Sequence, residues 1–326
     1  MARKRPTPTR LDKASGTQTA GLDRVMRSFE LETQRAFQQS TNHVLSNLDE
    51  MTRMLLQSNY EGAIAPLINS YVPLGDTLTD QFMRAGRMMA SEISTELSQP
   101  FGFDVLNPRT LEMMRAMRDS ANHDFTDTAA QTARNTLLRS LSPQFSPNGS
   151  VEMGAVARAL TDATGLSWRQ EQAIQNYEQL LRSGSREAFS RALRDRRSDT
   201  LAGRALSEDQ IKRMVAQYRA NYRKSQAKLI ARMNALRALN AGRYAALLQA
   251  DGEGLLTGIN IVRTWHAVGD TKTRDSHGAM QGQVQGINDP FLSGLGNYLM
   301  YPGDPDAPAE DVVNCRCQVD VAFQRG

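Results

Sequence analysis

The sequence predicts a mainly α-helical N-terminal region of long helices and hairpins, followed by a small α+β C-terminal module. Stretches rich in Ala, Leu, Arg and Gln, together with 15 methionines, favour helix over most of the 326 residues. After Gly252 and Gly254, β-branched and aromatic runs alternate with Gly, Pro, Asp and Asn, which is typical of short strands and turns. The chain is long enough for two domains.

Four consecutive segments are expected along the chain. Residues 1–18 combine Pro, Thr, Lys and Arg without apolar periodicity, which predicts a disordered basic arm. Residues 19–150 are the helical region, and 151–250 are a helical lead-in that ends in a basic helix. Residues 251–326 are the α+β module, and the Ser-, Pro- and Gly-rich stretch 142–150 is a linker.

The helices of the first half are predicted from apolar spacing and capping residues. Apolar residues recur every three to four positions over 21–59, which indicates one long amphipathic helix or two. Pro and Gly mark a turn over 66–75, after which Asp76 can cap the next helix. Asn107 followed by Pro108 is a suitable N-cap and first-turn pair for another long helix.

Two capping boxes predict the helices of the lead-in. Ser167 with Gln170 begins a helix that closes near Gly184, and Ser207 with Gln210 begins the basic helix. In the basic helix, apolar residues fall on a narrow stripe, and cations flank the stripe on both sides.

Positive charge is concentrated in that helix and in the N-terminal arm. The net charge is only +4, but nine Lys or Arg and no Asp or Glu occur from Ile211 to Arg243. Such a tract binds phosphate or an acidic protein surface, or it is simply a solvated helix face. The predicted nucleic-acid or partner contacts are Arg3, Lys4, Arg5, Lys212, Arg213, Arg219, Arg223, Lys224 and Lys228.

The last residues predict an inward-packed strand that carries both cysteines of the chain. Residues 314–323 alternate, with Cys315 and Cys317 on the apolar face. No apolar run approaches the length of a membrane span and no signal peptide is recognisable, so we expect a reducing, cytoplasm-like compartment and no membrane. A disulfide is disfavoured there, and two residues on one strand face stand side by side.

A zinc site and a thiol nucleophile are the two chemical alternatives for these cysteines. Possible zinc ligands are Cys315, Cys317 and His277, with Asp270 or His266 as a fourth. A single C-x-C pair is atypical for zinc, and buried apolar thiols explain the pattern as well. The common catalytic motifs are absent, and a thiol on an apolar face has a raised pKa. We therefore expect no enzyme, no metal and no cofactor, with zinc kept as an alternative.

A polar set in the module is predicted to hold its loops together. Asp270 can cap the turn that follows it, and Arg274 and Arg316 can each bind a carboxylate in a bidentate manner. The alternative is a polar pocket for a partner chain. The set comprises Trp265, Asp270, Arg274, His277, Asn314, Cys315, Arg316 and Cys317.

Five motifs in a fixed order resemble the phage Mu F-like family of head morphogenesis proteins, also called minor head or minor capsid proteins. The resemblance covers about residues 160–323, and the sequence departs from it at Met233 and Asn234, where the family has Thr-Glu. The motifs are Ile230-Ala-Arg232, Trp265, Asp270 with Thr273, Arg274 and His277, Tyr301-Pro-Gly-Asp-Pro305, and Asn314 to Cys317.

The resemblance implies a structural, non-catalytic protein of a tailed bacteriophage that takes part in head morphogenesis and DNA packaging. It implies a few copies in the virion, at the inner capsid or the portal vertex, after assembly in the host cytoplasm. The implied partners are the portal protein, capsid or scaffold subunits, and double-stranded DNA bound without sequence preference. The alternatives are an internal DNA-ejection protein and a thiol- or zinc-dependent enzyme.

Overall fold

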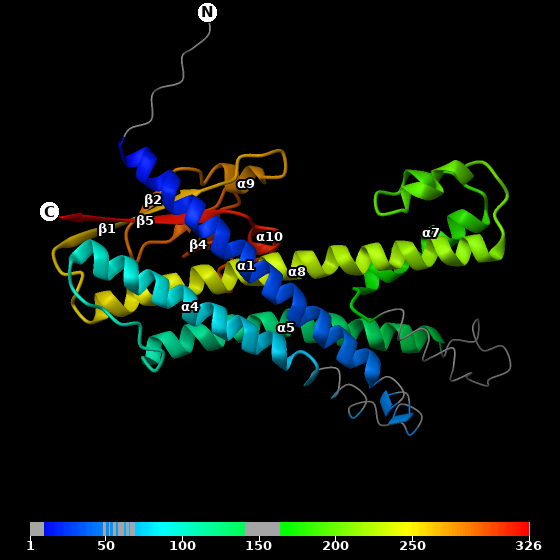
Figure 1. The fold of residues 1–326 in the computed structure, drawn as a ribbon, viewed down its shortest axis with the longest axis horizontal. Helices are drawn as coiled ribbons and strands as arrows, with labels where there is room; N and C mark the ends of the chain where they lie inside the picture. Colours follow the sequence, from blue (N-terminus) through cyan, green and yellow to red (C-terminus); the bar gives the residue numbers. More distant parts are fainter. Residues whose placement is uncertain are drawn as a thin grey trace, which may run out of the picture. The chain divides into compact units, whose positions relative to one another are not determined.

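The structure is a computed structural model that describes residues 10–47, 69–140 and 164–325, with isolated positions between 48 and 68 (Figure 1). Arg3, Lys4, Arg5 and the predicted linker 142–150 lie outside the described residues. Within the described part, the mainly helical fold with a small C-terminal α+β module is confirmed. None of the described helices is both long and apolar enough to cross a membrane.

In the described part of the chain, five long helices and two short 3-10 helices precede the module. The first helix begins at Arg10, so the structure differs from the predicted disordered arm over residues 10–18. The helices are α1 (Arg10–Ser46), α4 (Val72–Leu97), α5 (Pro108–Ser140), α7 (Trp168–Arg182), η1 (Arg186–Ser190), η2 (Arg196–Leu201) and α8 (Glu208–Gly252).

Capping explains where most of these helices start. Both predicted capping boxes form, and in the second the Ser207 backbone N–H donates to Gln210 Oε1 at 2.8 Å. Asn107 Oδ1 accepts the backbone N–H of Arg109 at 3.0 Å, which confirms the cap of α5. The Asp76 cap is wrong, because α4 begins four residues earlier at Val72. A proline at the second position of a helix costs no hydrogen bond, because the first backbone N–H groups of a helix have no partner within it. Pro73 is therefore compatible with a helix that begins at Val72.

The chain folds into two compact units, and each unit is built from separate stretches of sequence. The first unit contains the described residues of Met1–Thr33, Gly75–Ala121 and Ala231–Gly326. The second contains those of Gln34–Leu74 and Asn122–Ile230. The predicted domains, in contrast, are consecutive stretches. The boundary between Ile230 and Ala231 falls within α8, so each half of that helix belongs to a different unit.

The module in the first unit is a three-stranded antiparallel sheet with a separate two-stranded ribbon. The sheet order is β2–β1–β5, and β1 pairs with β5 along its whole length, with Trp265 opposite Val319 (Figure 1). The elements are β1 (Ile259–His266), α9 (Asp275–Gly278), β2 (Val284–Gln285), β3 (Phe291–Leu292), β4 (Tyr298–Leu299), α10 (Ala309–Val312) and β5 (Gln318–Arg325). With three strands of only two residues, most of the module is irregular backbone.

The core of the first unit joins helices to the module. Phe29 of α1, Ala85 of α4 and Leu239 of α8 share one buried cluster with Trp265 of β1. The second half of α8 is buried on all sides, from Asn234 to Ala250. A helix that is buried all round lies in the interior of the fold, and this part of α8 is rich in alanine.

The core of the second unit lies between α7 and the first half of α8. Tyr177 and Tyr218 are stacked, with ring centroids 4.0 Å apart, and Ile174 and Ile211 belong to the same buried cluster. Here only one stripe of α8 is buried, as the spacing of its apolar residues predicts.

Candidate functional site

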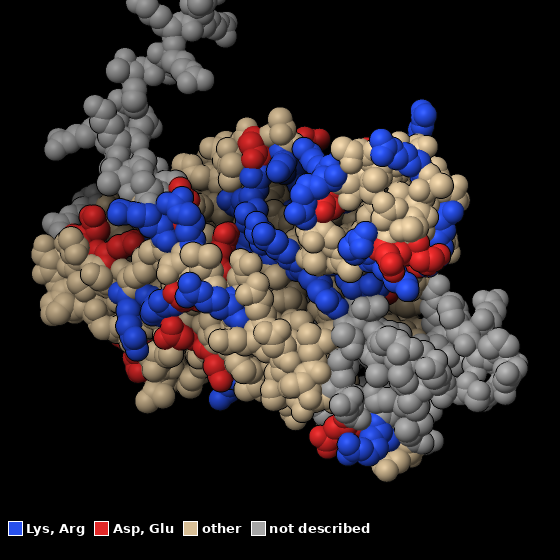
Figure 2. Space-filling view, turned by 45° about the vertical axis from the view of Figure 1, so that its right-hand side comes forward, with Lys and Arg blue, Asp and Glu red and all other residues tan. Residues whose placement is uncertain are grey.

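The first half of α8 presents most of the predicted contact residues. Lys212, Arg213, Lys224 and Lys228 are all exposed, and they flank the stripe that faces α7. Their long side chains can lie over the apolar seam while the charged heads reach water. On the face shown in Figure 2, Lys and Arg side chains lie in groups rather than being evenly spread, and acidic side chains adjoin several groups.

Two predicted contact residues of this half are instead used inside the second unit. The Arg219 guanidinium lies 3.0 Å from Glu171 Oε1 on α7, and the two side chains are only 13% and 7% exposed. Arg223 is half-buried, and its Nε donates to the carbonyl of Thr164 at 3.1 Å. Both are therefore poorly placed to contact a partner, unlike the four exposed cations.

In the second half of α8, Arg237 and Arg243 are buried within the first unit, and the exposed Arg232 is paired with an acidic side chain of the same unit. Arg243 is 5% exposed, and its guanidinium lies 3.1 Å from Glu92 of α4. Arg232 pairs with Glu30 of α1 at 3.2 Å, and Arg237 is 4% exposed. The tract contains no acidic residue in sequence, but other helices supply the carboxylates.

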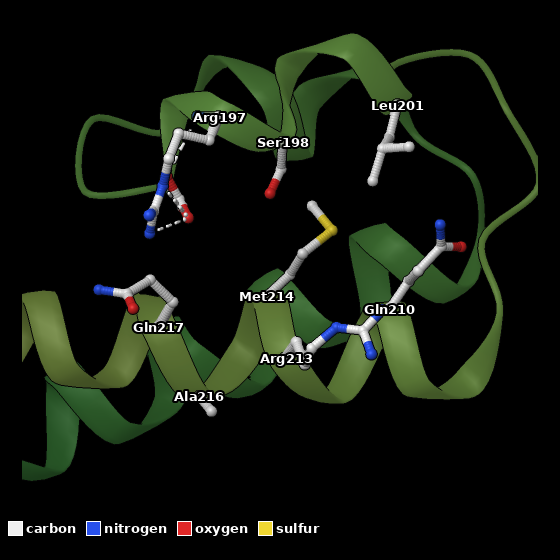
Figure 3. A pocket seen from close by; sticks show the side chains of 9 residues that line it. Arg197, Ser198, Leu201, Gln210, Arg213, Met214, Ala216 and Gln217 are labelled. Carbon is white, nitrogen blue, oxygen red and sulfur yellow. Dashed lines mark hydrogen bonds and ion pairs between the residues drawn. The ribbon is translucent and has the colours of Figure 1, made fainter.

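A hollow of about 510 Å³ lies between η2 and the start of α8 (Figure 3). Met214 points into it from α8, opposite Ser198 and Leu201, and Arg213 lies at its edge. Arg197 on the η2 side is held by Asp195, with Nε 3.0 Å from Oδ1. The hollow is thus lined by both polar and apolar groups beside an exposed cation.

Lys224 lines a second hollow of the second unit, with a volume of about 370 Å³. Its other walls are α1, through Phe37 and Thr41, and Gly165 in the segment before α7. Two of the four exposed cations in the first half of α8 therefore stand beside concave surface, where a partner chain or a phosphate backbone can approach them closely.

In the module, Arg316 binds a carboxylate in a bidentate manner as predicted, and the structure shows that this carboxylate belongs to Asp270. Arg316 donates to both carboxylate oxygens, with Nη1 2.6 Å from Oδ2, and Asp270 Oδ1 also accepts the backbone N–H of Lys272 at 3.0 Å. The hydrogen bond from Arg316 is the main cause that lowers the pKa of Asp270. Arg274 does not bind a carboxylate as predicted, because it donates to the carbonyl of Val313 instead. That bond fastens the turn to the segment after α10.

The structure brings His277 and both cysteines together in the core. His277 Nδ1 lies 3.3 Å from Cys317 Sγ, and the three ligand atoms lie within 4.8 Å of one another. Cys315 and Cys317 are 1% and 2% exposed, so their predicted inward packing is confirmed. The strand itself starts later than predicted, at Gln318, because Asn314 has a positive φ of 59° and turns the chain. Both cysteines therefore precede β5.

The two thiols differ in acidity. Hydrogen bonding to Cys315 is the main cause that lowers the pKa of Cys317, and His277 lowers it further. The pKa of Cys315 is raised by the same hydrogen bond and by burial. The expectation of a raised thiol pKa is therefore wrong for Cys317, because a neighbouring thiol and an imidazole stabilise its thiolate.

Two residues important to the module were not predicted from the sequence. Arg263 is 1% exposed, and it donates to three backbone carbonyls, including that of Met300 at 2.6 Å. The period of two along β1, which places Arg263 between Ile261 and Trp265 on the inward face, could have revealed it. Asp311 is fully buried in α10, and nothing in the local pattern marked it.

The match to a family model concerns the second half of the chain. Residues 169–320 match the family model described as "Phage Mu protein F like protein". Among curated proteins, the Minor head protein GP7 of Bacillus phage SPP1 is 33% identical over 93 residues, which is 28% of this chain and 28% of that protein. No solved structure matches.

Proposed function

From the membership of residues 169–320 in the Phage Mu F-like family, we propose that the protein is a minor head protein of a tailed phage. It serves head morphogenesis as a structural component, in the inner capsid or at the portal vertex, and acts by contact rather than by catalysis. The observation that carries this proposal is the family match, which runs from α7 to the first residues of β5. The name of the SPP1 relative agrees with it.

The exposed cations of α8 support a second part of the proposal, which is contact with packaged DNA. Lys212, Arg213, Lys224 and Lys228 are exposed, and no ion pair joins them to an acidic side chain of the described residues. Lysine and arginine on a helix face bind phosphates without reading bases, and they release counterions in doing so. The proposed binding is therefore independent of DNA sequence and weakens as salt rises.

Binding of duplex DNA by the full-length protein over a salt series tests this contact. The Lys224→Glu, Lys228→Glu double variant is compared with an Arg27→Glu, Arg87→Glu double variant, which changes the charge equally at exposed sites of α1 and α4. If each lysine neutralises one phosphate, the first variant loses two phosphate contacts. The plot of log K against log salt then becomes less steep, by about 1.8 in slope. An equal loss of binding in both variants, or no binding by the wild type at low salt, would refute a specific role for α8.

The position in the particle is tested separately. Copy number and radial position in intact virions, measured by mass spectrometry and cryo-microscopy, are expected to place a few copies at the portal vertex or the inner shell. Particles emptied of DNA are expected to retain the protein. Its loss together with the genome would favour a DNA-ejection protein instead.

A further inference from the structure

We propose that His277, Cys315 and Cys317 form a Zn²⁺ site that fastens α9 to the segment before β5. The His277 Nδ1 atom and the two cysteine sulfurs are the protein ligands. This site is independent of the proposed role in the phage head and of the exposed cations of α8.

The distances suit a tetrahedral ion. With Zn–S bonds of about 2.3 Å and a Zn–N bond of about 2.0 Å, neighbouring ligand atoms lie roughly 3.5 to 3.8 Å apart. The three atoms here lie within 4.8 Å of one another, and Nδ1 is already 3.3 Å from Cys317 Sγ. Small side-chain rotations therefore suffice to close the site.

A buried carboxylate stands where the outer partner of a zinc-bound histidine is usually found. A histidine that ligates zinc commonly donates its other ring N–H to a carboxylate, which fixes the tautomer. The His277 Nε2 atom lies 3.5 Å from Asp311 Oδ1, and both residues are buried. Asp311 is itself held, because Oδ2 accepts from the hydroxyl of Ser293 at 2.9 Å and from the side-chain amide of Asn297 at 2.8 Å.

The location explains why the module benefits from an ion. The ligands come from two segments that are far apart in sequence and are joined by loops, β2, β3, β4 and α10. Such a small, irregular module has few regular hydrogen bonds, and a metal link between distant segments adds its binding free energy to folding. Trp265 packs edge-on to the His277 ring, with centroids 6.0 Å apart, and helps to hold the ring in place.

The fourth position is left for a water molecule. Among the described residues, the group whose ligand atoms all lie within 4.8 Å of one another consists of His277, Cys315 and Cys317, and Asp311 faces the other ring nitrogen of His277. The other two candidates from the sequence are engaged elsewhere, since Asp270 binds Arg316 and His266 lies 3.1 Å from Asp320. Because the three ligands are at most 2% exposed, a substrate has no access, and the site is structural.

Metal analysis of the full-length protein, purified without chelators or an affinity tag that binds metal, is the first test. One zinc per chain is expected, and Co²⁺ in its place should give the intense visible bands of tetrahedral coordination and a thiolate charge-transfer band. Cys315 and Cys317 are the only cysteines in the chain, so that band reports this site alone. Zinc far below one equivalent per chain, together with a weak octahedral cobalt spectrum, would overturn the proposal.

Two variants sharpen the test. Asp311→Asn retains all three ligands and should weaken Zn²⁺ binding about 10- to 100-fold. His277→Gln should remove one ligand and shift the cobalt bands. The control variant Lys228→Met, on the first half of α8, should leave the Zn²⁺ affinity and the cobalt spectrum unchanged.

Removal of zinc with a chelator should lower the melting temperature of the wild type. An unchanged melting temperature would refute the structural role, and zinc binding by Asp311→Asn at wild-type strength would refute the part assigned to Asp311.

Discussion

Both halves of α8 carry Lys or Arg side chains, but the two halves differ in how far these side chains are exposed. In the first half, Lys212, Arg213, Lys224 and Lys228 are exposed beside a single buried stripe. In the second half, every residue from Asn234 to Ala250 is buried, because α1, α4 and the module pack around α8. Arg237 and Arg243 are therefore buried as well. The sequence shows one uninterrupted basic tract, but among the described residues the four exposed cations that form no ion pair lie in its first half, whereas the exposed Arg232 of the second half is paired with Glu30.

A stretch of sequence without Asp or Glu can still be surrounded by acidic side chains, because other helices of the fold supply them. Arg243 meets Glu92, and even in the first half Arg219 meets Glu171, although each carboxylate lies on another helix. A buried arginine needs polar partners because an unpaired charge in the interior is costly, and these two arginines find carboxylates where Arg263 finds backbone carbonyls. The length of a basic tract therefore overstates the surface that can bind phosphate.

The largest expected effect comes from filling the close approach between α8 and α4 in the first unit. A Cβ atom on Gly242 would lie 2.2 Å from the carbonyl oxygen of Phe82. We expect Gly242→Ala to lower the free energy of unfolding by about 3 kcal/mol, measured by urea denaturation, because backbone must move. Gly252→Ala is the control, since its Cβ meets nothing within 4 Å, and it should be neutral or slightly stabilising. Equal stability of both variants would contradict the packing.

The next effect separates a buried cation from an exposed one. Arg243→Met leaves Glu92 without its partner and should cost about 2 kcal/mol, less than for a fully buried pair because the Glu92 side chain is 30% exposed. Lys228→Met removes an exposed charge and should change stability by less than about 0.5 kcal/mol. The same urea series measures both. Similar costs for the two would break the distinction between the halves.

The smallest effect depends on pH and concerns Arg237. Burial raises the pKa of Asp304 above its ordinary value, and the charge of Arg237 opposes that rise. A raised folded-state pKa favours folding below the unfolded value of 3.8, and this contribution is lost as pH rises through the folded pKa. Above the folded-state pKa, where the carboxylate is ionised, the charge of Arg237 partly offsets the loss. Arg237→Met should therefore cost about 1 kcal/mol at pH 7 and less at pH 4. An equal cost at both values would exclude this attraction.

The resemblance to the Phage Mu F-like family, the helices and most of their caps could be predicted from the sequence. The capping boxes at Ser167 and Ser207 and the cap at Asn107 form because each depends on residues only a few positions apart. The inward packing of Cys315, Cys317, Val319 and Val321 followed from the alternation of residues near the end of the chain. The cap at Asp76 failed because Pro73 fits either a turn or a first helical turn, and local sequence does not decide between them.

The sequence by itself determined local structure and the presence of Cys315, Cys317 and His277 as possible ligands, because helix signals and residue chemistry are local properties. Only the tertiary structure decided that these three side chains meet beside Asp311, and which cations of α8 remain exposed. Those outcomes depend on contacts between segments far apart in the chain, which no local pattern encodes.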